Sequence, residues 1–141
     1  MIETIKLDSG REVQLASSAA FLYIYQNQFR EDPFEKLFTM IKEVQDFMSE
    51  GEDTEKEQEP KAEVDTFGLM QKIDILFLSN LTWALAKNAD GSIPGPIEFY
   101  QNNPDFLPLN HVDVIVDLAT NSLVSTGEIP EKNQTSPQAN Q

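Results

Sequence analysis

The chain has 141 residues, a length that typically forms one domain, and we expect a single helical domain over residues 1–127 followed by a disordered tail over 128–141. Its 24 acidic and 10 basic residues give a formal net charge of -14, which disfavours binding to nucleic-acid phosphates and to anionic membranes. The sequence has no cysteine, so disulfides, thiolate catalysis and cysteine metal ligands are excluded.

The first fifteen residues predict a β-hairpin over 2–15. Apolar residues alternate on both sides of "DSGR", a segment whose Asp, Ser and Gly favour a tight turn; these residues are Ile5, Leu7, Val13 and Leu15. A two-stranded hairpin is marginally stable alone, so we expect its apolar face to pack on the helices that follow. The segment lacks the organisation of a signal peptide, which favours a cytoplasmic protein.

Two helices are predicted next. Ser17 or Ser18 caps a first helix that runs to about Phe29, and Asp32-Pro33-Phe34 begins a second, well-capped helix. The second helix carries one apolar stripe, made of Phe34, Leu37, Phe38, Ile41, Val44, Phe47 and Met48. Most of such a stripe is expected in the core. The alternative is that part of it stays available to a partner, a role that suits flexible Met side chains.

Residues 50–65, "EGEDTEKEQEPKAEVD", predict a mobile acidic loop. The segment contains eight acids, two lysines and no aromatic residue, so it cannot bury enough apolar surface to offset the entropy of ordering. Its acids lack the spacing of a calcium-binding loop, and we expect no metal site there.

The remaining helices follow in order. A third helix, roughly 65–88, is apolar on nearly all sides and is expected at the centre of the fold. "NADG" ends it, and the prolines of "IPGP" impose a corner before a short helix in "PIEFYQNN". The last helix begins near Leu109. The expected fold is therefore a mainly α, compact bundle of about five helices with a small N-terminal hairpin.

The sequence offers little to catalysis. The single histidine, His111, lies at the start of the last helix and is interpreted as a helix-end residue without function. The six glycines are scattered and form no phosphate-binding loop, and the carboxylates lie where nothing would raise a pKa. We therefore predict no catalytic, cofactor-binding or metal-binding residue, no cofactor and no enzyme activity. The corner that contains Trp83 is predicted to have a structural role, in which it folds the last two helices back against the third helix.

Three stretches resemble one known family: the hairpin leading to "AAFLYIYQNQFREDPFEKLF" (19–38), "LTWALAKNADGSIPGPIEF" (81–99), and the final helix before a polar tail. The chain resembles the tail assembly chaperones of long-tailed bacteriophages, particularly those of phages and prophages of Gram-positive bacteria. Tyr25, Phe29 and Asp32 match the family pattern, whereas Arg30 stands where glycine is usual. The second stretch matches at Trp83, Ala84, Ala86, Lys87, Ala89, Asp90, Pro94, Pro96, Glu98 and Phe99. The likeness covers roughly residues 1–125.

The resemblance implies a helical protein of the host bacterial cytoplasm that binds the aggregation-prone tape measure protein before the tail tube polymerises around it. Such a protein is not expected in the mature virion. Neither nucleic acid nor membrane is an expected partner, and a homo-oligomer is compatible with the role. The apolar stripes described above suit this role, because a helix-in-groove contact masks a helical client without catalytic residues.

Members of the family are often made in two forms, and the longer, frameshifted form is thought to recruit the tail tube protein. Here, Glu131-Lys132-Asn133 encoded as GAA AAA AAC would contain the slippery heptamer A AAA AAC. A frameshift at this point would leave the predicted folded body unchanged.

Two other functions compete with this one. An acidic DNA mimic that inhibits a nucleic-acid-binding enzyme would use the charge of -14, but it needs carboxylates held at fixed spacing, and the densest acids lie in the predicted mobile loop. A structural phage tail or connector protein would instead remain in the finished particle.

Overall fold

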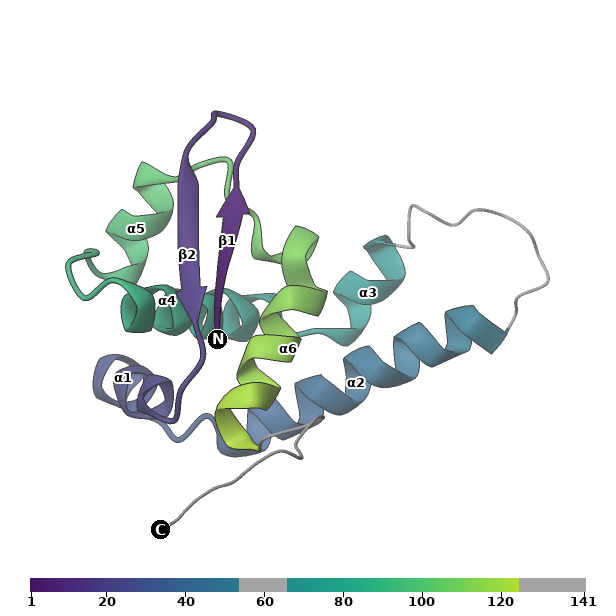
Figure 1. Ribbon diagram of the computed structural model, residues 1–141. Coiled ribbons are helices and arrows are strands. Elements are labelled where there is room, and N and C mark those ends of the chain that lie inside the picture. The colour runs from purple at the N-terminus through teal and green to yellow at the C-terminus, as the bar shows by residue number, and fades with distance from the viewer. Residues whose placement is uncertain (54–65, 125–141) are drawn as a thin grey trace, which may run out of the picture.

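The computed structural model describes residues 1–53 and 66–124 (Figure 1). The predicted disordered tail over 128–141 and most of the predicted mobile loop lie outside these residues. The loop prediction was wrong for residues 50–53, which continue the second helix to Asp53. A formed helix gains one backbone hydrogen bond for each residue added, and this stretch contains no proline to stop it.

The N-terminal hairpin is confirmed. β1 (Ile2–Lys6) pairs antiparallel with β2 (Glu12–Ala16), with Ile5 opposite Val13. Ile5, Leu7, Val13 and Leu15 are all buried, as the alternation predicted. Gly10 in the turn has φ +96°, a left-handed conformation that glycine adopts without strain.

The rest of the described chain is mainly helical, so the predicted mainly α class is confirmed. The described residues form six α-helices and one short 3-10 helix. They are α1 (Ala20–Phe29), α2 (Phe34–Asp53), α3 (Thr66–Lys72), α4 (Ile75–Ala89), α5 (Pro96–Asn102), η1 (Pro108–His111) and α6 (Val112–Leu123).

The single helix predicted over 65–88 is two helices, which raises the count from about five to six. Asp74 has an extended backbone, and its carboxylate accepts a 3.0 Å hydrogen bond from the Phe77 N–H, so it caps α4. An aspartate before an apolar run satisfies a free helical N–H in this way. The first turn of α4 is also less covered than predicted, since Leu76 is 71% exposed.

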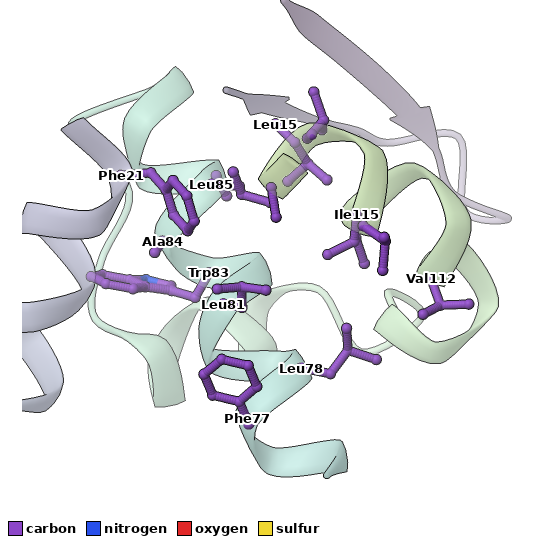
Figure 2. Packing of buried hydrophobic residues seen from close by; sticks show 14 of the residues in the cluster. Leu15, Phe21, Phe77, Leu78, Leu81, Trp83, Ala84, Leu85, Val112 and Ile115 are labelled. Carbon is purple, nitrogen blue, oxygen red and sulfur yellow. The ribbon is translucent and has the colours of Figure 1, made fainter. Parts of the chain in front are cut away.

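α4 is nevertheless the central helix. It lies between α1, the hairpin and α6 in Figure 1, and Figure 2 shows its side chains meeting those of the surrounding elements. Leu78, Leu81 and Leu85 of α4 are fully buried, together with Leu15 of β2 and Ile115 of α6. These residues belong to one hydrophobic cluster that joins the hairpin to the helices.

Arg30 ends α1 with φ 60° and ψ 35°, in the left-handed region, and its N–H donates a 2.9 Å hydrogen bond to the Gln26 carbonyl. We expect Arg30→Gly to stabilise the protein by about 0.5–1 kcal/mol, because relief of roughly 1–2 kcal/mol of strain exceeds the extra chain entropy of glycine. Urea unfolding followed by circular dichroism measures the change. Arg30→Ala, which keeps the strain, should give no such gain; an equal gain from alanine would contradict this explanation.

Candidate functional site

The structure divides the predicted apolar stripe of α2 into a buried and an exposed part. Leu37 and Val44 are buried, and Met40, which is not among the predicted stripe residues, is also buried. Ile41 and Phe47 are partly buried against the core. Three members remain exposed to solvent: Phe34 at 49%, Phe38 at 63% and Met48 at 44%.

The exposed residues share one edge of the helix. Phe34, Phe38 and Met48, with partly buried Ile41 between them, follow at helical spacings, so the four lie along one line, and we call them the α2 apolar edge. With a rise of about 1.5 Å per residue, this edge is roughly 20 Å long. It is long enough to contact about four turns of another helix.

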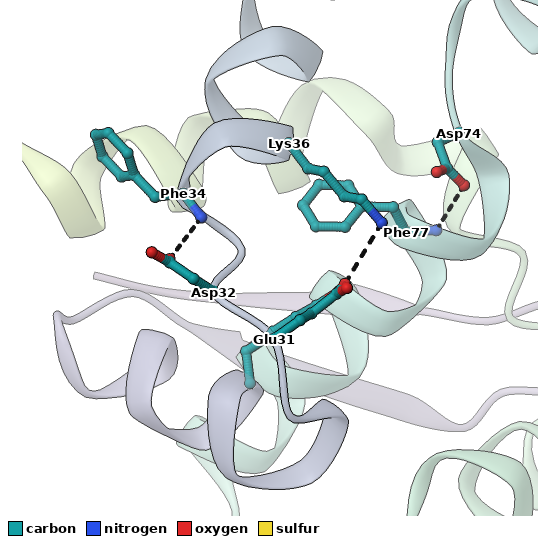
Figure 3. Close-up of polar contacts among 7 residues, drawn as sticks. Glu31, Asp32, Phe34, Lys36, Asp74 and Phe77 are labelled. Carbon is teal, nitrogen blue, oxygen red and sulfur yellow. Dashed lines mark hydrogen bonds and ion pairs between the residues drawn. The ribbon is translucent and has the colours of Figure 1, made fainter.

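The two phenylalanines form the beginning of this edge. Their rings stack at a centroid distance of 6.0 Å with an angle of 19° between the planes. Asp32 accepts a 3.0 Å hydrogen bond from the Phe34 N–H. This predicted cap fixes the start of the helix at Phe34, the first residue of the edge. Figure 3 shows the Phe34 ring pointing away from the ion pair between Glu31 and Lys36. The ion pair between Glu31 and Lys36 therefore does not cover the Phe34 ring.

Beside the α2 apolar edge runs a groove between α2 and α6, with a volume of about 630 Å³. Val44 and Met48 of α2 and Val116 of α6 supply its apolar lining. Asp113 and Asp117 of α6 also line it, and both are exposed. We call it the acid-rimmed groove. It was not predicted from the sequence, because it depends on how α6 lies against α2.

The opposite side of α2 is occupied by polar contacts. Lys36 lies 3.5 Å from the Glu31 carboxylate and 5.8 Å from the centroid of the Phe77 ring (Figure 3). Glu31 also accepts a 3.0 Å hydrogen bond from the hydroxyl of buried Tyr25. This side of the helix contacts the body of the protein, whereas Phe34, Phe38 and Met48 of the α2 apolar edge remain exposed.

The corner after α4 is held by hydrogen bonds. The Trp83 indole N–H donates to the Pro94 carbonyl at 2.9 Å, and the Lys87 ammonium donates to the carbonyls of Gly91 and Ile93 at 2.7 Å each. Hydrogen bonds from Ser92 hold the pKa of the Asp90 carboxyl below its ordinary value. The contacts account for the tryptophan and the lysine of this segment as structural residues.

We expect Trp83→Phe to destabilise the protein by about 1–3 kcal/mol, because the change removes the indole donor and leaves a partly buried carbonyl without it. Far-UV circular dichroism must follow the unfolding, since the variant has no tryptophan. Ser92→Ala at the same corner removes only exposed contacts and should cost at most about 0.5 kcal/mol. Equal effects of the two changes would argue against the indole bond.

The aromatic residues that carry the family resemblance come together in or against the core. Phe29 of α1 lies edge-to-face with Trp83 of α4 at 5.7 Å, and Tyr25 lies 4.6 Å from Phe29. Phe99 of α5 is buried in the same cluster. The two matching stretches therefore form one packed unit around α4.

His111 ends η1 and is half-buried, with its ring 5.8 Å from that of Phe106. Burial lowers the pKa of its imidazole below the ordinary value. Across residues 1–53 and 66–124, no three His, Asp or Glu side chains gather into a set that could hold a metal ion. None of the helices in these ranges combines the length and the apolar character that a membrane crossing requires.

No family model matches this chain, and no curated protein or solved structure matches it.

Proposed function

We propose that the protein is a tail assembly chaperone of a long-tailed bacteriophage or prophage, which binds the tape measure protein and keeps it soluble during tail tube assembly. The observation that carries the proposal is the α2 apolar edge, where Phe34, Phe38 and Met48 are exposed beside a groove. A row of exposed apolar side chains of this length is typical of a surface that binds another protein.

The backbone around Arg30 also supports the proposal. The resembled family usually has glycine at this position, and Arg30 has the left-handed conformation that favours glycine. The match at Trp83, Lys87 and Pro94 has a comparable basis, since Trp83 donates to the Pro94 carbonyl and Lys87 donates to two other carbonyls of the same corner. Arginine in place of the usual glycine at position 30 is therefore compatible with a left-handed backbone at this position.

In the proposed role the protein acts by binding, without catalysis. The client's apolar helix would cover the α2 apolar edge, while the charge of -14 would keep the complex dispersed. The proposal includes a cytoplasmic location, a frameshifted longer form that recruits the tail tube protein, and absence from the finished virion.

Co-expression tests the proposal. The gene neighbourhood should encode a very long, largely helical protein, and its soluble yield should rise when this chain is co-expressed with it. Both proteins should elute together in size-exclusion chromatography. A tape measure protein that precipitates equally with and without this chain would refute the proposal. Recovery of the chain from purified virions at ring-like copy number would instead identify a structural tail component.

A further inference from the structure

The acid-rimmed groove combines apolar and acidic lining residues, which bears on the chemistry of the partner. Its apolar floor comes from Val44 and Val116, which are buried, and from Met48, which is partly exposed and can adapt its shape. The groove is continuous along α2 with the α2 apolar edge, because Met48 belongs to both. Of the edge residues only Met48 lines the groove, so a helix bound between Met48 and α6 would reach Phe34 and Phe38 only where it extends along α2 beyond the groove.

The charge on the α6 side of the groove has one sign. Asp113 and Asp117 are four residues apart on α6, so they lie on the same face, one turn from each other. No lysine or arginine is among the described residues that line the groove. Lys36 and Lys42 of α2 are already paired with Glu31 and Asp46 at 3.5 Å and 3.2 Å. A helix that enters the groove meets negative charge along α6.

The chain itself offers no suitable occupant. Residues 54–65 carry five acids against two lysines, and residues 125–141 contain a single large aliphatic residue, Ile129. Neither segment has an apolar stripe with basic flanks. A second copy of the chain, also charged at -14, would be repelled by the first.

We propose that the acid-rimmed groove binds a partner helix whose apolar stripe is flanked by lysine or arginine, with these basic residues facing Asp113 and Asp117. The inference deepens the proposed function and rests on it, since it gives the chemistry of the client segment. The apolar floor and the α2 apolar edge supply affinity, and the two carboxylates select the charge and the orientation of the helix.

The test uses two synthetic amphipathic helices of about 18 residues with the same leucine stripe, one flanked by lysines and the other by glutamates. Fluorescence anisotropy with the full chain at about 0.1 M salt, where the Debye length is about 10 Å, should show about tenfold or greater preference for the lysine peptide. In D113K/D117K this preference should reverse. The milder D113N/D117N should reduce it while keeping side-chain size, which guards against misfolding of the lysine variant.

The matched control is D8K/E98K, which changes the net charge by the same amount at exposed acids of the hairpin turn and α5, away from α2 in Figure 1. Circular dichroism should confirm that every variant is folded. The control should keep most of the preference, because exposed charges more than a Debye length apart are largely screened. Equal binding of the two peptides, or equal loss of preference in the control, would overturn the inference.

The outcomes separate this inference from the proposed function. Absence of a charge preference, with the tape measure protein still kept soluble, would refute only the groove assignment. A clear charge preference, with no effect on the tape measure protein, would support recognition of basic helices and refute the phage role.

Discussion

Replacing Phe34 and Phe38 with serine should weaken binding of the helical client about 100-fold while leaving the fold intact. The rings are 49% and 63% exposed, so about half of each is available for burial by a partner. Full burial of a phenylalanine contributes about 1.5–3 kcal/mol, so the exposed halves of both rings together contribute roughly 2–3 kcal/mol. Since about 1.4 kcal/mol corresponds to a factor of ten, the loss approaches 100-fold.

The measurement is the soluble yield of the co-expressed tape measure protein, followed by titration of the purified complex. The control is Ile97→Ser, which removes an even more exposed apolar side chain (76%) from α5, away from α2 in Figure 1. Its client binding should equal that of the natural chain. The double serine variant should lose roughly 1–3 kcal/mol of stability, because about half of Phe34 and a third of Phe38 are covered in the fold, and circular dichroism should confirm that it stays folded. Normal client binding by this variant would exclude the α2 apolar edge as the site.

The largest expected effect on stability comes from Leu81→Ala. Leu81 is fully buried in α4 and lies in the centre of the cluster shown in Figure 2. Removal of its side chain leaves a cavity among the side chains packed around α4, at a cost of about 3–5 kcal/mol. A domain of this size has a total stability of roughly 5–15 kcal/mol, so the variant should be close to unfolding at ordinary temperatures.

Leu76→Ala provides the matched control, because it makes the same chemical change on the same helix. Leu76 is 71% exposed, and alanine has the higher helix propensity, so its effect should lie within about 0.5 kcal/mol of zero. Urea unfolding of both variants measures the difference. The two variants should differ because Leu81 is buried and Leu76 is exposed. Similar losses of unfolding free energy would contradict this orientation of α4.

Local patterns were sufficient for most elements of the fold. Alternation predicted the buried residues of the hairpin, and the cap at Asp32 predicted where α2 begins. The corner after α4 followed from "NADG" and two prolines, which restrict the backbone whatever surrounds them. The break between α3 and α4 at Asp74 was not predicted, because Ile73 and Ile75 continue the apolar pattern on both sides of it. Asp74 therefore did not stand out as an N-cap residue.

The sequence by itself determined the mainly α class, the hairpin, the helical stripe on α2 and the negative charge, because each depends on residue types and their spacing. Only the tertiary structure decided which part of the stripe is buried, since burial depends on where neighbouring helices lie. It placed Leu37 and Val44 in the core and left Phe34 and Phe38 exposed. It also brought Asp113 and Asp117 of α6 beside Met48 of α2, more than sixty residues earlier. No local pattern encodes that contact, because it arises from the packing of α2 and α6 around a shared core.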